Sequence, residues 1–324
     1  YKLLFKYFTY LIFLSFLIFS NPKIIYSLYE KYSNLLFYIT IFSFFSYVLN
    51  FLNITSSTLL ISSGNREYFS SFFNILMSDS KVSYMGYQIY RFQSIFEEPG
   101  TYSFLLLPVI FWYQYVDIKR FRFYLLVAAL IFTMSIGSIL VLALVYVLIS
   151  LLNRKSYKYL TYIVAISIAL FLIIYSNDFL SDYIANKFGF GAYANTHTSL
   201  GVREKEVFYL LNLLKDQFLG VGFSTAGLGV ISGGAYISIG LFRLFCYSGF
   251  FGMIFLVCLF AYLITYSIYL FNKRDNIIKF SAAVLFSMLA MSLQRSSFID
   301  GYMFVLLFAS VFPMLKYRFY NESI

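Results

Sequence analysis

The sequence predicts an all-α integral membrane protein, a polytopic bundle of about nine transmembrane helices. Hydrophobic residues make up 61% of the 324 residues and charged residues only 12%, which leaves too little polar surface for a water-soluble exterior. The apolar residues gather in runs close to the roughly 20 residues that a helix needs to cross a bilayer. The net charge of +10 comes from Lys and Arg in short connections between these runs rather than from a basic stripe. We therefore predict no nucleic-acid partner.

The apolar runs define the predicted spans, and a turn at residues 135–138 joins the two short spans in the middle of the chain. In order, the spans are 3–19, 35–52, 101–116, 123–135, 137–152, 159–175, 241–271, 277–293 and 302–315. We treat residues 1–324 as a single polytopic membrane domain. Because the chain begins with Tyr1 and is apolar from the start, we expect a preceding segment that adds one further helix.

The charges of the connections predict the topology. Three short connections, around residues 117–122, 154–158 and 273–279, carry more Lys and Arg than Asp and Glu, so the positive-inside rule makes them cytoplasmic. Alternation then places the two long loops, 53–100 and 177–240, on the outer face, and both loops are slightly acidic. We expect the chemistry of the protein in these two loops, where the chain meets water.

Each long loop contains apolar residues at helical spacing, which predicts a short amphipathic helix lying in the membrane interface. In the first loop the apolar positions are Phe69, Phe72, Phe73, Leu76 and Met77. In the second they are Val207, Leu210, Leu211, Leu214 and Phe218, with Glu204, Glu206, Lys215 and Asp216 expected on or near the wet side. Gly220 is the expected stop of the second helix, because helices often end on a residue that tolerates left-handed geometry.

The first candidate site is the segment 91–100, directly before the third predicted span. Pro99 suits the first turn of a helix, so we expect Glu98 to cap that helix and Arg91 to lie close by. The helix terminus and Arg91 favour an anion, while Glu97 or Glu98 could accept a proton from a sugar hydroxyl. An ion pair between Arg91 and Glu98 that only anchors the loop is an equally good interpretation.

The second candidate site is Arg203 with its amphipathic helix and the glycine-rich segment 220–234. Arginine matches phosphate oxygens with a planar fork of donors, and the turn at Gly220 and Gly222 could present backbone N–H groups to the same oxygens. A pyrophosphate suits both features. Thr225 stands where a dinucleotide fingerprint needs glycine, so neither nucleotide-binding loop is present. A plain flexible loop is the simpler interpretation of the glycines.

Arg243 and Arg295 lie near the predicted outer ends of the seventh and eighth spans, where a costly intramembrane charge suggests function. Their side chains could instead extend to the lipid headgroups. His197 is the single histidine, and Asp178 with Asp182 gives too few ligands for a hard cation, so we predict no metal and no cofactor.

These stretches resemble the Wzy-type O-antigen polymerase and O-antigen ligase superfamily, whose members join undecaprenyl-linked glycans at the outer face of the bacterial inner membrane. Residues 91–99 are similar to its element of arginine, aromatic residue and acidic-Pro before a membrane helix. Arg203 through Gly222 resembles its second element, an arginine followed by an amphipathic helix and a Gly-x-Gly turn. Residues 133–138 resemble its short hairpin, and residues 249–252 its Gly-x-x-Gly.

The resemblance implies a polymerase of undecaprenyl-pyrophosphate-linked oligosaccharide repeat units for O-antigen, capsule or exopolysaccharide. Its implied place is the inner membrane, with the active site on the periplasmic face, beside membrane lipid and a flippase and chain-length regulator of the same pathway. The implied catalytic residues are Glu98, Glu97 and Arg203. The implied pyrophosphate ligands are Arg91, Arg203, Arg295, Arg243, Gly220 and Gly222.

Two rival functions stay open. An O-antigen ligase shares the scaffold, but ligases of the superfamily carry a histidine shortly before the Gly-x-x-Gly, where this chain has none in residues 234–238. A flippase or other transporter often shows inverted repeats and charges at the bilayer midplane. This chain shows no evident repeat and places its charges at the membrane boundary and in the outer loops, which favours group transfer.

Overall fold

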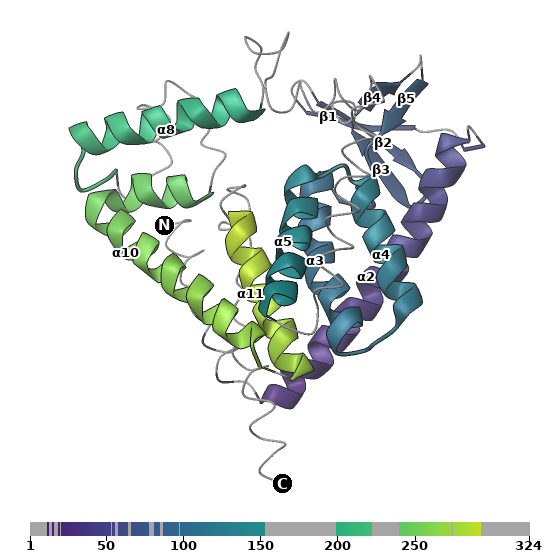
Figure 1. Ribbon diagram of the computed structural model, residues 1–324. Helices are drawn as coiled ribbons and strands as arrows, with labels where there is room; N and C mark the ends of the chain where they lie inside the picture. Colours follow the sequence, from purple (N-terminus) through teal and green to yellow (C-terminus); the bar gives the residue numbers. More distant parts are fainter. Residues whose placement is uncertain are drawn as a thin grey trace. The chain divides into compact units, whose positions relative to one another are not determined.

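The computed structural model describes residues 21–152, 199–221, 240–273 and 275–292, with gaps at 53, 56–57, 64–65, 78–80, 85–86 and 97, and also residues 12, 15 and 19. These residues form seven helices and five short strands in two compact units (Figure 1). The α3 unit contains α2, the strands, α3, α4 and the first parts of α5 and α11. The α8 unit contains α8, α10 and the ends of α5 and α11.

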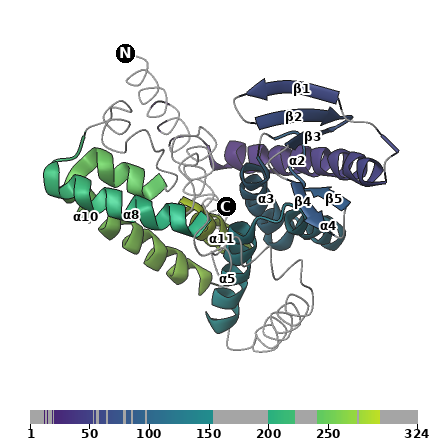
Figure 2. The same cartoon turned by 90° about the horizontal axis from the view of Figure 1, so that it is seen from above.

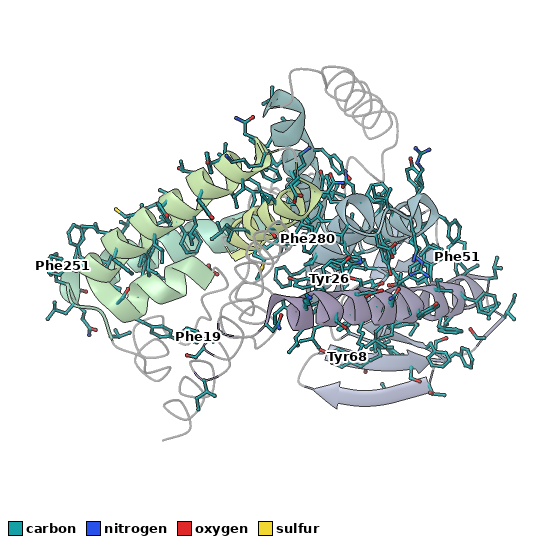
Figure 3. All side chains as sticks on the ribbon, turned by 90° about the horizontal axis from the view of Figure 1, so that it is seen from below. Phe19, Tyr26, Phe51, Tyr68, Phe251 and Phe280 are labelled. Atoms are coloured by element: carbon teal, nitrogen blue, oxygen red, sulfur yellow. The ribbon has the colours of Figure 1, made fainter. Side chains whose placement is uncertain are left out.

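The α3 unit is built around a buried helix. Its helices are α2 (Pro22–Phe51), α3 (Pro99–Tyr115), α4 (Arg120–Phe132) and the first parts of α5 (Ile136–Leu152) and α11 (Asn276–Ser292). Nearly every residue of α3 is buried, which is the arrangement expected of a helix that is apolar on all sides. The ring of Trp112 on α3 stacks on Tyr29 of α2 with centroids 5.9 Å apart. It also meets Phe280 of α11, which is labelled in Figure 3, edge-on at 5.5 Å.

Two described helices are long and apolar enough to cross a membrane, over Lys23–Phe51 in α2 and Phe245–Phe271 in α10. The apolar stretches Ile136–Leu148 and Asn276–Met291 are shorter. Six of the predicted spans therefore correspond to helices, while 159–175 and 302–315 lie outside the described residues and 3–19 lies largely outside them. Within the described part the bundle has fewer spanning helices than the nine predicted.

The prediction of an amphipathic helix in the first long loop is wrong, and with it the prediction of a purely α-helical fold. This loop forms two antiparallel sheets, seen beside α2 in Figure 2. One sheet has the order β1-β2-β3 and the other pairs β4 with β5. The strands are β1 (Thr58–Ser63), β2 (Arg66–Ser71), β3 (Asn74–Met77), β4 (Lys81–Tyr84) and β5 (Tyr87–Tyr90).

The hairpin between β2 and β3 explains the error. Phe69 pairs with Leu76 across the hairpin, so residues seven apart, which share one face of a helix, are also register partners here. Phe72 adopts a φ of 50° in the tight turn between the strands, a conformation that ends any helix. The helix α2 then supports the hairpin, because the Ser46 hydroxyl donates to the carbonyl oxygen of Ser71 at 2.6 Å.

The α8 unit consists mainly of two helices packed along each other, α8 (Ser199–Asp216) and α10 (Gly240–Phe271) (Figure 1). The second helix is broken at Gly249, where φ is 65° and ψ is −162°, and it changes direction there. Leu210, Leu213 and Leu214 of α8 are buried against Phe245, Cys246 and Tyr247 in the first part of α10. α8 is therefore docked on α10 next to the break.

Candidate functional site

The first candidate segment begins with an arginine that holds a helix end. The Nε of Arg91 donates to the carbonyl oxygen of Thr133 at 2.9 Å, and its Nη2 donates to that of Met134 at 3.2 Å. The backbone N–H of Phe92 donates to the Phe132 carbonyl at 3.0 Å. The last carbonyls of a helix have no partner within the helix and attract a cation. Arg91 thus secures the turn between α4 and α5.

The residues after Arg91 fold back onto neighbouring helices. A tight turn, in which the Phe96 N–H donates to the Gln93 carbonyl at 3.1 Å, places Ser94 at a φ of 57°. The Ser94 hydroxyl donates to Ser43 of α2 at 2.7 Å. The rings of Phe92 and Phe96 pack on Tyr102 of α3, with centroids 5.4 and 5.3 Å away. The segment is therefore fixed on both α2 and α3.

The segment ends where the sequence predicts that a helix begins. Pro99 is the first residue of α3 and Glu98 is its N-cap, so both predictions are confirmed. The Glu98 carboxylate makes no capping hydrogen bond, and the N–H groups of Thr101 and Tyr102 donate to the Glu98 backbone carbonyl instead, each at 3.1 Å. The Glu98 carboxylate thus stands at a helix N-terminus, at a position from which it could accept a proton from a hydroxyl.

The second candidate segment is carried by α8. The predicted helix is confirmed, but it begins at Ser199, so Arg203 lies inside its first turns rather than before it, and the structure describes only the backbone there. The helix ends at Asp216, four residues earlier than the expected stop at Gly220. A short turn follows, and Gly220 closes it with the expected left-handed geometry, a φ of 79°.

The exposure of α8 differs from the predicted two-sided pattern. Val207 and Leu211 are exposed, while Leu210 and Leu214 are buried against α10. Glu206, expected on the wet side, is only 4% exposed. The reason is the spacing: positions 203, 206, 210 and 213 recur every three or four residues, so they follow one stripe of the helix. Leu210 and Leu213 on this stripe are buried against α10, and Glu206 is buried one turn before them. A buried carboxylate one turn from Arg203 was missed, although that spacing already indicated it.

The glycine turn after α8 meets the break in α10. A Cβ atom at Gly220 would overlap the backbone of Gly249, and a Cβ at Gly249 would overlap the backbone of Leu219 and Gly220. Two hydrogen bonds of 2.9 Å join the same segments, from the Val221 N–H to the Cys246 carbonyl and from the Phe250 N–H to the Phe218 carbonyl. The sequence identified both glycine motifs but did not indicate that they touch.

The remaining predicted site residues are placed less fully. Arg243 lies in the first turns of α10, where the structure again describes only the backbone. Glu97, Gly222 and Arg295 lie outside the described residues, as do His197, Asp178 and Asp182. Segment 91–98 belongs to the α3 unit, while Arg203, Gly220 and Arg243 belong to the α8 unit. The two candidate segments therefore belong to different units of the structure, and the geometry of each is given separately.

A second structural arginine was counted in the sequence only as part of a basic connection. Arg122 donates to the Oδ1 of Asn34 at 2.6 Å and to the hydroxyl of Tyr113 at 3.0 Å, and it lies 4.6 Å from the ring centroid of Phe37. It links α2, α3 and α4. Among the described residues, no group of three His, Cys, Asp or Glu side chains is arranged to hold a metal ion.

No protein-family model, curated protein or solved structure matches the chain, so its function has to be inferred from its own residues.

Proposed function

We propose that the protein is an integral-membrane glycosyltransferase that polymerises undecaprenyl-pyrophosphate-linked oligosaccharide repeat units on the outer face of the bacterial inner membrane. The observation that carries the proposal is the contact between Gly220 and Gly249. These glycines belong to the Gly-x-Gly turn and the Gly-x-x-Gly, two stretches far apart in sequence that both resemble elements of the polymerase and ligase superfamily. Their contact supports the proposal, because it brings together two stretches that the resemblance had singled out separately.

The surface of the helices supports placement in a membrane. α2 and α10 are long and apolar enough to cross a bilayer. Large apolar side chains remain exposed along both helices, among them Phe42 and Phe45 on α2 and Phe255 and Val257 on α10. Surfaces of this kind are stable in contact with lipid and are rare on soluble monomers. We further propose that the membrane is the bacterial inner membrane, that the site faces outward, and that the other predicted spans also cross the bilayer.

The proposed reaction is a transfer of the growing glycan between lipid carriers. The bond between the anomeric carbon of the donor and the pyrophosphate oxygen breaks, and a glycosidic bond forms to a hydroxyl of the non-reducing-end sugar on another repeat unit. Undecaprenyl pyrophosphate leaves, and a carboxylate takes the hydroxyl proton. Catalysis needs positive charge at the leaving group and a base at the attacking hydroxyl.

The residues of this chain divide between these two tasks. Glu98, or Glu97 beside it, is the proposed base, and Glu98 stands at the N-cap of α3, where its backbone carbonyl accepts from the N–H groups of Thr101 and Tyr102. The proposed pyrophosphate ligands are Arg203, Arg243 and Gly220 of the α8 unit, together with Gly222 and Arg295, which lie outside the described residues. Arg91 stays a predicted pyrophosphate ligand, but two of its donors already hold the α4–α5 turn, which gives it a supporting role in addition.

The test is a gel analysis of surface polysaccharide from cells that lack the protein, complemented with the intact chain, Arg203→Ala or Lys215→Ala. Lys215 is the matched control, because it is an exposed cation on the same helix outside the proposed site. We expect the intact chain and Lys215→Ala to give a ladder of long chains. We expect Arg203→Ala to give single lipid-linked repeats, since losing one charge-stabilising donor costs about 10²- to 10³-fold in rate.

Each other outcome points to a different function. Long chains made by Arg203→Ala would contradict the assigned role of this arginine. Long polymer left on its undecaprenyl carrier in cells without the protein would indicate a ligase. Repeat units trapped on the cytoplasmic side would indicate a flippase.

A further inference from the structure

We infer that Gly220 and Gly249 are positioning residues, whose backbone contact docks α8 onto the broken helix α10 and sets the register of the turns that carry Arg203 and Arg243. The docking follows from the geometry of the α8 unit alone. Its consequence for glycan transfer rests on the proposed function.

The contact is between main chains, so no side chain can move away to relieve a larger residue. A Cβ at Gly220 would lie 2.7 Å from the carbonyl oxygen of Tyr247 and 2.8 Å from that of Cys246, and closer still to the backbone nitrogen of Gly249. Real Cβ atoms almost never come so close to such atoms. Both glycines also adopt positive φ angles, 79° and 65°, which any other L-residue reaches only with strain. The two positions therefore require glycine for two independent reasons.

The turn after α8 also supplies hydrogen-bond partners for backbone groups at the break in α10. Breaking a helix leaves carbonyl groups before the break and N–H groups after it without partners, and these are costly in an apolar environment. At this break the carbonyl of Cys246 accepts from the Val221 N–H and the N–H of Phe250 donates to the Phe218 carbonyl, both at 2.9 Å. The turn can form these bonds only because Gly220 and Gly249 let the main chains approach.

The contact fixes how the two helices lie along each other. Just before it, Leu210, Leu213 and Leu214 are buried against the residues of α10 that precede the break. Val221 packs against the same cluster from the turn. Since α8 carries Arg203 and the first part of α10 carries Arg243, a shift at the contact moves the two positions relative to each other. Transfer rates fall steeply when such positions are displaced by about 1 Å.

The experiment measures docking by disulfide formation with the native Cys246. Leu210→Cys, Leu213→Cys and Leu214→Cys are made singly in the full chain carrying Cys258→Ser, oxidised in membranes, and the linked peptides are quantified by mass spectrometry. All three leucines share a buried cluster with Cys246, so at least one pair should lie within the Cα separation of about 7 Å that a disulfide allows. If none of the three forms the bond, the docking itself is refuted, whatever any glycine variant does.

Gly249→Ala is then added to the best pair, with Phe255→Ala as the control. Phe255 lies six residues further along α10 and is 67% exposed. We expect Gly249→Ala to lower the yield of the linked peptide after a brief oxidation by about tenfold or more, since positive-φ strain alone accounts for that factor. We expect Phe255→Ala to leave the yield unchanged. An unchanged yield in Gly249→Ala overturns the inference.

The positioning role is tested by chain length at matched amounts of membrane protein. Gly249→Ala should shorten the polymer, and oxidation prolonged until most chains carry the engineered disulfide should lengthen it again by locking α8 on α10. A merely structural glycine would give no such recovery once protein amounts are equal. Normal polymer despite lost cross-linking overturns the positioning role. If the intact chain makes no polymer at all, the proposed function is wrong. The cross-linking experiment still tests the docking of α8 on α10, because it does not depend on polymer formation.

Discussion

The two candidate segments are fixed by opposite means. In the α3 unit, the long side chain of Arg91 reaches across to the carbonyl oxygens of Thr133 and Met134. In the α8 unit, the missing side chains of Gly220 and Gly249 allow two main chains to touch and to form hydrogen bonds directly. The first attachment depends on a guanidinium group, and the second depends on the absence of a side chain at each glycine.

This difference determines how each attachment responds to mutation. A side chain can be replaced by one that keeps part of its bonds, so damage at Arg91 should be graded. A main-chain contact has no partial form, because even one methyl group overlaps atoms that cannot rotate away. We therefore expect the glycine contact to be all-or-none and the arginine attachment to be tunable.

The largest effect we expect in the α3 unit is that of Arg91→Leu. It removes two hydrogen bonds from a charged donor and leaves helix carbonyls without partners, which should destabilise the unit by about 2–4 kcal/mol. Arg91→Lys keeps the charge but lacks the fork that reaches two carbonyls, so its loss should be roughly half as large. Thermal unfolding of the detergent-purified protein measures both. Equal losses in the two variants would contradict a graded attachment.

A smaller effect distinguishes clashes with side chains from clashes with the backbone. A Cβ at Gly252 would overlap the Cβ and Oγ of Ser248 rather than any main-chain atom. Gly252→Ala should therefore destabilise the protein by the roughly 1–3 kcal/mol typical of overpacking, and Ser248→Gly should restore most of it in the double variant.

The control for this pair is Gly249→Ala combined with Leu219→Ala. Leu219 is exposed, and the overlap at Gly249 is with its backbone, so shortening its side chain should restore nothing. The measurement compares the unfolding temperatures of the two glycine variants and the two double variants. Rescue of Gly249→Ala by Leu219→Ala would show that the contact is adaptable, and the contrast between the two units would disappear.

The sequence predicted local features well wherever one strong preference acts. Pro99 has a fixed φ and lacks an N–H, so the start of α3 could be placed to the residue. The helical spacing from Val207 onward predicted α8 correctly. The same kind of spacing failed at Phe69 and Leu76, because a hairpin with a two-residue turn pairs residues that are seven apart. Periodicity alone does not separate these two structures when the run is short.

Long-range contacts were beyond prediction from this one sequence. Nothing local to Gly220 or Gly249 indicates that they touch, because the contact depends on where the chain returns after the intervening residues. The burial of Glu206 could have been predicted, because its spacing from Leu210 and Leu213 places it on the same stripe of the helix. Its acidic side chain favoured the wet side instead, and packing against α10 overrode that preference.

The smallest effect we expect comes from Arg122→Lys, which tests whether arginine attachments in the α3 unit are alike. Lysine keeps the charge and can still donate to Asn34, but it loses the planar group that lies over the ring of Phe37 and also donates to Tyr113. The loss should be about 1 kcal/mol in thermal unfolding. It should be smaller than that of Arg91→Lys, because the partners of Arg122 are side chains, which can turn toward a shorter donor, whereas helix carbonyls are fixed. If Arg122→Lys loses as much stability as Arg91→Lys or more, the rigidity of the hydrogen-bond partner does not determine the loss. The difference between the attachment at Arg91 and the attachment at the glycines would then need another explanation.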